Sequence, residues 1–414
     1  MGGLDLNAGL EQLLRQIDPY LSHAPSIAYF CTYVPPEVIA ACGARPMRIF
    51  GLPKPPLQAD RLLPRNLCPY VRSCLETLMA PGTIQGPIAG AIFAGSCNAM
   101  MQLAEAWRKY AAKGQGFFFY LDLPHKSTVG ARDHYAHNLR ALARSLSAFL
   151  TEEYGQPLLS EPELDLRIRL AIEQYQEVRR SLVGLYQLRR RQDIHLQPGL
   201  VEEAVAAAMS YQPKAFLKAW ENSGISLAIQ HATGQLGDDR CFGNDHKVRL
   251  LCTGSIFWPA WLRFLDQNGA EVVYEDCCLG IRPLLLAEGE SGGVACPQGG
   301  LEGPAPARPD DPWKWLASSY LTKVPCSRML SSAQRADRLL SAVKEYRAQA
   351  VIYYALKFCD FALYDYPYFK EKLAQAKVPL LYLESDYTIS ALGQQATRVE
   401  AFMEMLAIGQ AGAR

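Results

Sequence analysis

The sequence lacks the features that indicate a membrane protein, a secreted protein or a nucleic-acid-binding protein. Its 42 Lys and Arg residues nearly balance 41 Asp and Glu residues, so a formal charge of +1 gives no reason to expect a nucleic-acid or anionic-membrane partner. The most apolar stretch, residues 87–104, is short and diluted with Gly, Ala, Ser and Asn, which argues against a membrane span. The first residues contain no basic region followed by an apolar run, so we expect no secretory signal and a soluble cytoplasmic protein.

Several common cofactor motifs are also missing. No GxxxxGK(S/T) phosphate loop occurs, so we do not expect the chain to hydrolyse ATP through one. No GxGxxG follows an expected strand, which weakens a nicotinamide hypothesis. The absence of HExxH and CxxC leaves common zinc sites and thioredoxin-type redox motifs unsupported.

Cysteine, by contrast, is abundant, with twelve residues among 414. A disulfide framework fits poorly in a long chain without a signal, because the cytosol keeps thiols reduced. The remaining interpretations are buried apolar thiols and metal ligands, and we expect both kinds here.

Two halves of the sequence repeat one plan of elements. Apolar runs of four to eight residues alternate with helical patterns, which is typical of a parallel α/β sheet. The expected elements are strands at 26–33, 47–52, 89–94 and 116–123 with a helix at 35–44 in the first half, and strands at 247–254, 271–276, 350–357 and 379–385 with a helix at 255–270 in the second.

We therefore predict an α/β fold of two Rossmann-like parallel-sheet domains with an intervening helical segment. The expected divisions are an N-terminal helical segment at 1–25, the first domain at 26–132, the helical region at 133–240, and the second domain at 241–414 with a Gly- and Pro-rich surface insertion at 288–312. Ser160 and Glu163 form a candidate capping box for a helix that begins at Glu161, with apolar positions at 166, 170 and 175.

Three cysteines lie at or near the place where α/β proteins usually bind ligands, beyond the carboxyl ends of strands. Cys97 and Cys359 each follow an expected strand, and Cys68 lies in a loop just before a helical run that begins with Pro69. Thiolates in such loops suit soft metals, above all iron–sulfur clusters. For each cysteine taken alone, a buried structural thiol is the simpler interpretation.

An ordered set of motifs then carries a resemblance across residues 27–407. The motifs are VPPEVIAACGARPMRIFG (34–51), LCPYVRSCLE (67–76), GSCNAMM (95–101), FYLDLP (119–124), LLCTGSIF (250–257), YEDCCLGIRPL (274–284), DPWKWLASSYLTKVPC (311–326), KFCDFALYDYPYFK (357–370) and LLYLESDYTISALGQQATRVEAFMEML (380–406). With these motifs in this order, the chain resembles the family of 2-hydroxyacyl-CoA dehydratase and benzoyl-CoA reductase subunits, including D-components of 2-hydroxyglutaryl-CoA dehydratase.

The resemblance implies a [4Fe-4S] cluster held between two Rossmann-like domains by three cysteines. Carried over by position, these ligands would be Cys68, Cys97 and Cys359, with Cys74 as a rival for the first place. Three thiolates on four irons leave one iron open, which can contact a substrate oxygen while the cluster delivers one electron.

The resemblance also implies a reaction class and partners. Family dehydratases remove water from (R)-2-hydroxyacyl-CoA through a ketyl radical to give 2-enoyl-CoA, whereas family reductases add electrons to an aromatic acyl-CoA ring. In both, a separate ATP-dependent iron–sulfur activator supplies the electron, and a homologous partner chain commonly completes a heterodimer, although a homodimer stays open. We favour dehydration, with ring reduction as the alternative; the acyl group and any acid or base residue are not assigned.

Two further alternatives stay open. A branch of the family carries a double-cubane cluster, for which Cys277 and Cys326 could supply further thiols, although Ser255 and Arg328 stand where additional cysteines would be expected. The other is a non-catalytic, electron-storing paralogue.

Other conspicuous residues have simpler interpretations. The run Arg189–Arg191 could hold coenzyme A phosphates, but we favour a solvated helix end. The tryptophans at 258–261 and 313–315 are expected in the core or an interface. Glu384 and Asp386 could act as acid or base, although a capping or ion-pair role is the favoured interpretation.

Overall fold

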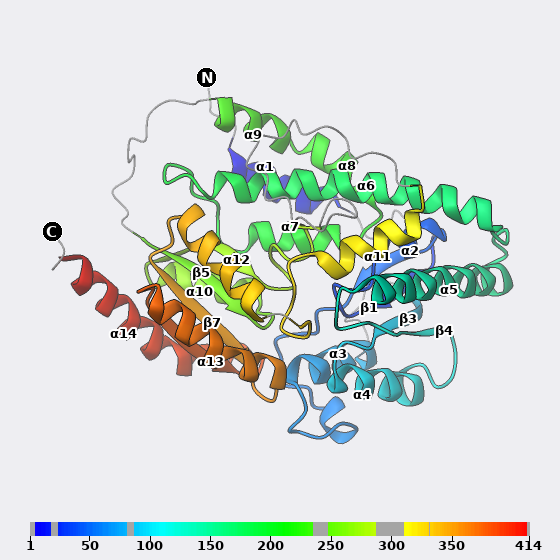
Figure 1. Cartoon of the computed structure of the whole chain (residues 1–414), viewed down its shortest axis with the longest axis horizontal. Helices are drawn as coiled ribbons and strands as arrows, with labels where there is room; N and C mark the ends of the chain where they lie inside the picture. Colours follow the sequence, from blue (N-terminus) through cyan, green and yellow to red (C-terminus); the bar gives the residue numbers. More distant parts are fainter. Residues whose placement is uncertain are drawn as a thin grey trace.

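The computed structural model describes residues 5–17, 24–80, 87–234, 247–286, 310–330 and 332–411. Two lobes, each built on a four-stranded parallel sheet, lie side by side beneath a layer of long helices (Figure 1). The predicted α/β class with two parallel sheets is therefore confirmed. Most of the predicted insertion at 288–312 lies outside the described residues. Within these ranges no helix is long and apolar enough to cross a membrane.

The first sheet has the strand order β2-β1-β3-β4. Its strands are β1 (Ser26–Tyr29), β2 (Arg45–Arg48), β3 (Ile88–Ala94) and β4 (Phe117–Leu121), and its helices are α2 (Pro36–Ala41), α3 (Pro69–Met79) and α4 (Asn98–Ala106). The expectation of a strand at 47–52 was displaced, because β2 begins at Arg45 and ends at Arg48. Beyond it, Gly51 has a φ of 74° and the Leu52 N–H donates to the Ser73 hydroxyl, so the backbone leaves the ladder.

The second sheet repeats the same plan with the order β6-β5-β7-β8. Its strands are β5 (Val248–Gly254), β6 (Ala270–Asp276), β7 (Ala350–Leu356) and β8 (Leu380–Ser385), and its helices are α10 (Pro259–Gln267), α12 (Ser332–Glu345), α13 (Asp360–Gln375) and α14 (Ala391–Ala411). In both sheets the second and third strands of the chain order flank the first, so the connections diverge there. This divergence creates a switch point at each carboxyl edge, the usual ligand position in such sheets.

Helices from the rest of the chain cover and join the two lobes. They are α1 (Leu6–Gln16), α5 (Val129–Tyr154), α6 (Glu161–Leu188), α7 (Leu200–Ala208), α8 (Pro213–Asn222), α9 (Ile225–Gly234) and α11 (Pro312–Thr322). The capping box of Ser160 and Glu163 is present as predicted. The expected apolar face of α6 was misplaced, since Leu166 and Leu170 are exposed and the buried stripe instead passes through Leu164 and Ile168.

Helix α6 connects the two lobes through two buried arginines. Arg179 lies in its C-terminal half, and Arg189 immediately follows its last residue. The Arg179 guanidinium donates to Glu37 of α2 at 2.6 Å and to the Tyr320 hydroxyl of α11 at 2.9 Å. Further along the chain, Arg189 donates to Glu275 of β6 at 2.8 Å and to Glu202 of α7 at 3.1 Å. Because each charge is buried and paired, rotating one lobe against α6 would strand a buried ion.

The run Arg189–Arg191 is therefore not a solvated helix end. Arg189 is only 4% exposed, and Arg190 pairs with Glu345 at 3.0 Å. Arg191 pairs with Asp193. The expectation of a solvated end was wrong because carboxylates distant in sequence converge on the C-terminus of α6. These guanidinium groups already have carboxylate partners, so they do not form a free phosphate-binding patch.

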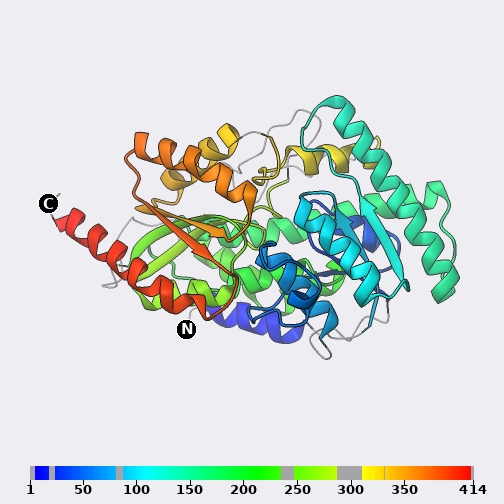
Figure 2. The ribbon, with the colours of Figure 1, turned by 90° about the horizontal axis from the view of Figure 1, so that it is seen from below.

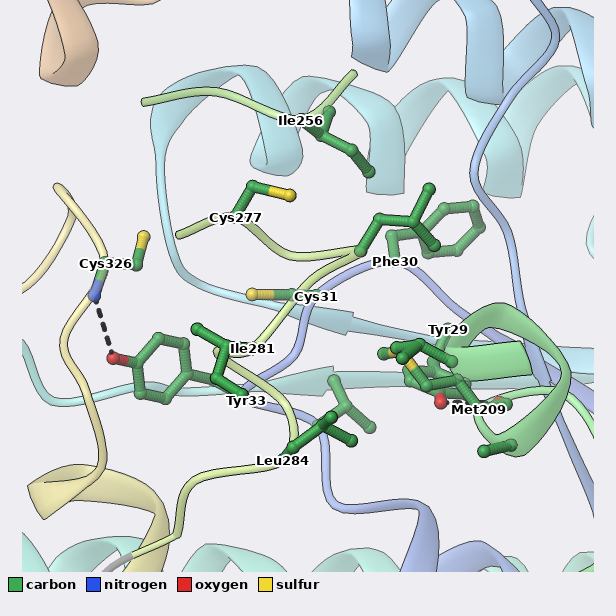
Figure 3. Packing of buried hydrophobic residues seen from close by; sticks show 14 of the residues in the cluster. Tyr29, Phe30, Cys31, Tyr33, Met209, Ile256, Cys277, Ile281, Leu284 and Cys326 are labelled. Carbon is green, nitrogen blue, oxygen red and sulfur yellow. Dashed lines mark hydrogen bonds between the residues drawn. The ribbon is translucent and has the colours of Figure 1, made fainter. Parts of the chain in front are cut away.

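Between the lobes lies a packed region in which residues from both sheets interdigitate. Figure 3 shows Cys31 and Tyr33, which follow β1, facing Ile281 and Cys326, and the Cys326 N–H donates to the Tyr33 hydroxyl at 3.4 Å. Trp261 and Trp313 are 3% and 1% exposed, as expected for core anchors. The apolar core thus continues across the junction of the lobes.

Breaking the α2–α6 ion pair should destabilise the whole chain. We expect Arg179→Met to lower the free energy of unfolding by about 3–5 kcal/mol, because Glu37 is left charged and fully buried. Urea unfolding followed by circular dichroism measures this change. The matched control is Arg108→Met, which removes the same charge from an exposed pair with Glu105 and should change stability little. Equal effects of both variants would contradict a joining role for Arg179.

The two carboxylates at Arg189 predict a pH dependence of stability. Burial raises the pKa of Glu275 to about 8, Arg189 opposes this rise, and the Glu202 carboxylate adds to it. A raised folded pKa contributes stability below the unfolded value, and this stability is lost as the pH rises through about 8. We expect a lower melting temperature at pH 9 than at pH 6. Glu202→Gln removes the carboxylate that adds to the rise in the pKa of Glu275, so the stability of this variant should depend less on pH. An unchanged pH dependence would contradict this contribution of Glu202.

Candidate thiol centre between the lobes

Three cysteines occupy the same local position, the residue immediately before a helix. Cys68 precedes α3, Cys97 precedes α4 and Cys359 precedes α13, and none of the three residues caps its helix with its side chain. In Figures 1 and 2, α3 and α4 belong to the first lobe, and α13 of the second lobe meets α3 at the junction. Three helix N-termini therefore present sulfur atoms where their dipoles favour negative charge.

The three thiols share one electrostatic environment. Burial raises the pKa of Cys68 to about 12, the Cys359 thiol adds to this rise, Arg328 opposes it, and Cys97 makes a smaller upward contribution. Cys68 and Cys359 are buried, whereas Cys97 is half-buried. The Cys68 thiol therefore remains protonated on its own, and a metal that replaces its proton would supply the missing positive charge.

Cys74 lies elsewhere in the packing. Its side chain is fully buried within α3, with Sγ 3.9 Å from the Ile49 carbonyl oxygen. Burial raises its pKa to about 12, and its side-chain partner is Tyr70. The structure thus brings Cys68, rather than Cys74, into the electrostatic range of both Cys97 and Cys359.

Arg328 connects the thiols of both lobes. Its guanidinium donates to Cys359 Sγ at 3.9 Å and to Cys326 Sγ at 3.6 Å. Burial lowers the pKa of Arg328, but the thiols of Cys97, Cys326 and Cys359 raise it well above its usual value. The loop that carries Arg328 is held from the first lobe, where His125 Nδ1 lies 2.6 Å from the Arg328 carbonyl oxygen and the His125 carbonyl accepts from the Leu330 N–H at 2.9 Å.

A second group of thiols consists of Cys31, Cys278 and Cys326, and Arg328 contacts this group through Cys326. Burial raises the pKa of Cys31, and Cys278 and Cys326 add to that rise. For Cys326, burial is outweighed by Arg328, Arg282 and the Arg328 backbone N–H, which together lower its pKa to about 7. Sequence reasoning singled out Cys277 and missed Cys278, because adjacent residues with the same side chain give no sign of which one faces the other lobe.

The surroundings of both thiol groups carry more buried positive than negative charge. Arg282 is paired with Asp276 at 2.6 Å, but Arg48, Lys323 and Arg328 form no ion pair with a carboxylate within the described residues. Lys323 Nζ donates to the Thr32 carbonyl at 2.6 Å and lies 4.2 Å from the Tyr33 ring centroid. Arg48 and Lys323 are buried and Arg328 is half-buried. Because cations shielded from water are costly without a partner, this region suits an anionic group.

The donors present are therefore sulfur atoms in a cationic, largely dry environment. Within the described ranges, no three His, Cys, Asp or Glu side chains are grouped closely enough to hold one metal ion. In an iron–sulfur cluster each thiolate binds a different iron, so its ligands need not converge on one point. Glu384 and Asp386 lie outside both thiol groups and make local hydrogen bonds to Tyr382 and Thr388.

Fold and site together define a two-lobed α/β protein with thiols gathered at the carboxyl edges of both sheets. The chain belongs to the family of the 2-hydroxyglutaryl-CoA dehydratase D-component, whose sequence model matches residues 31–406.

Three relatives show what this chain is similar to over nearly its full length. It is 24% identical over 392 residues to an Escherichia coli (strain K12) protein with the provisional name dehydratase subunit YjiM, covering 92% of this chain and 91% of the relative. It is 23% identical to the (R)-2-hydroxyglutaryl-CoA dehydratase beta subunit of Acidaminococcus fermentans, covering 90% of each chain. Its identity to a benzoyl-CoA reductase subunit of Thauera aromatica is 22%, over 89% of this chain and 88% of the relative.

The residue before Cys359 gives a prediction about the local backbone. Phe358 has a φ of 60°, in the left-handed region that bulky residues rarely adopt, and its side chain is 46% exposed. We expect Phe358→Gly to be more stable than Phe358→Ala by about 1 kcal/mol, because only Gly adopts this backbone without strain. Thermal unfolding of the two variants measures the difference, and the opposite order would contradict the left-handed turn.

Proposed function

We propose that this chain is an iron–sulfur subunit of a 2-hydroxyacyl-CoA dehydratase-like enzyme. The observation that supports the proposal is that Cys68, Cys97 and Cys359 each precede a helix, and that Cys97 and Cys359 both raise the pKa of Cys68. The family membership and the dehydratase names of two relatives support this reaction class.

The residues present fit a [4Fe-4S] cluster held by these three cysteines. Sulfur donors, low water access and an excess of buried cations all suit an anionic iron–sulfur group. When bound, such a cluster would supply one-electron reduction and one iron without a protein thiolate, which can act as a Lewis acid.

In this proposal the three cysteines, the helix N-termini and Arg328 each have a separate role. Cys68 and Cys359 are buried and would exclude water from their side of the cluster, whereas half-buried Cys97 leaves the other side more open. The N-termini of α3, α4 and α13 would stabilise the thiolates through their backbone dipoles. The Arg328 guanidinium would compensate negative charge shared by Cys97 and Cys359.

The proposed reaction removes water from an (R)-2-hydroxyacyl-CoA to give a 2-enoyl-CoA. The relatives are named as subunits, so we include a homologous partner subunit and an ATP-dependent activator that delivers the electron. Reduction of an aromatic acyl-CoA is the alternative, supported by the relative named as a benzoyl-CoA reductase subunit.

Iron content tests the ligand set. In anaerobically prepared protein we expect roughly four irons and four acid-labile sulfides per chain, with an EPR signal after reduction. Cys359→Ser and Cys68→Ser should lose most of this iron, while Cys74→Ser, at an equally buried cysteine of α3, should retain it. Iron-free wild-type protein after reconstitution, or loss of iron in Cys74→Ser but not in Cys68→Ser, would overturn the proposed site.

Turnover then separates the reaction classes. The reconstituted chain with its partner subunit and activator should convert (R)-2-hydroxyacyl-CoA and leave benzoyl-CoA unchanged. The reverse result would favour the reductase. Turnover that survives removal of Cys68, Cys97 and Cys359 would instead identify a non-catalytic subunit.

The second thiol group favours one further candidate, a double-cubane protein. Cys278 and Cys326 both raise the pKa of Cys31, and the Arg328 side chain contacts both Cys326 and Cys359. In this case roughly eight irons per chain are expected, and Cys326→Ser should remove about half of them.

A further inference from the structure

We infer that Arg328 is the charge-compensating residue of the proposed cluster and raises its reduction potential. The inference rests on the proposed function and concerns a residue that binds no metal. Two contacts carry it, to Cys326 at 3.6 Å and to Cys359 at 3.9 Å, and Cys97 of the first lobe also influences the pKa of Arg328.

The position of Arg328 is fixed by its surroundings rather than by an ion pair. Its guanidinium carbon lies 5.8 Å from the centroid of the Phe361 ring on α13, and its backbone is held by His125 from the first lobe. No carboxylate within the described ranges forms a salt bridge with it. The charge is therefore directed at sulfur rather than at a carboxylate, and one of these sulfurs, that of Cys326, has its pKa lowered to about 7 against the effect of burial, with Arg328 among the causes.

The expected effect follows from electrostatics. Reduction adds one negative charge to a cluster, so a fixed positive charge nearby stabilises the reduced state more than the oxidised state. Hydrogen bonds from N–H groups to thiolate sulfur act in the same direction. Arg328 is half-buried, so its charge is screened less than that of an exposed arginine.

This arrangement requires the two lobes to keep their relative position. Arg328 belongs to the loop after α11, Cys97 belongs to the first lobe, and Cys359 belongs to the second. His125 follows β4 and pins the Arg328 loop with two hydrogen bonds. Displacing this loop would separate the guanidinium from both thiols without altering either cysteine.

The test is the midpoint potential of the reconstituted protein, followed by EPR during an anaerobic redox titration. We expect Arg328→Met to reduce the equilibrium constant for one-electron reduction about tenfold, which corresponds to about 59 mV. Arg328→Lys keeps the charge and should recover part of this loss. Arg65→Met is the matched control, because it removes an exposed arginine three residues before Cys68 and should leave the potential unchanged.

The outcomes separate this inference from the proposed function. If wild-type protein holds iron and the potential of Arg328→Met equals that of Arg65→Met, the inference fails and the cluster proposal stands. Equal shifts in Arg328→Met and Arg328→Lys also overturn it, because the effect would then come from packing rather than charge.

Two further outcomes concern assembly. If Arg328→Met holds no iron but Arg328→Lys does, charge compensation is supported, since the cluster requires the cation to form; if neither variant holds iron, the inference is overturned. Iron-free wild-type protein would overturn the proposed function and this inference together.

Discussion

The architecture depends on two buried arginines at α6 and its C-terminal end, each paired with carboxylates of a different lobe. Arg179 holds α2 and α11, and Arg189 holds α7 and β6. Unpaired, each of these charges would cost several kcal/mol, so the ion pairs oppose sliding of the lobes past α6. A continuous apolar core also holds the lobes together, but hydrophobic contacts depend less on direction than ion pairs do. The buried pairs thus add the geometric precision that an interlobe site requires.

This precision matters because the residues of the thiol centre come from both lobes. The cysteines before α3 and α4 come from one lobe, the cysteine before α13 comes from the other, and Arg328 reaches them from a loop that His125 fastens. Each contribution is a short segment at the carboxyl edge of a strand or the start of a helix. Such segments can supply functional side chains because the strands and helices that hold them form the packed scaffold.

Charge explains why the centre lies where it does. Arg48, Lys323 and Arg328 bring positive charge into the junction without a carboxylate salt bridge in the described residues. A protein that evolved only for stability would pair or replace these cations, since buried unpaired charge is unfavourable. Their presence beside two groups of thiols makes this region favourable for a negatively charged group.

Much of this could be predicted from the sequence, because short-range patterns determine short-range structure. Apolar runs predicted all eight strands of the two sheets, with β2 displaced, and Ser160 and Glu163 predicted the start of α6. The sequence also predicted that Cys68 precedes a helix and that Cys97 and Cys359 follow strands, and these positions are as predicted; the assignment of the three as cluster ligands, which rests on the order of the family motifs, stays a prediction. What only the tertiary structure decided was partnership: that Arg189 is buried against Glu202 and Glu275, that Cys278 rather than Cys277 joins Cys31 and Cys326, and that Arg328 lies among the thiols. These contacts join residues far apart in the chain, and no periodicity encodes them, because they arise only when both sheets are packed against α6.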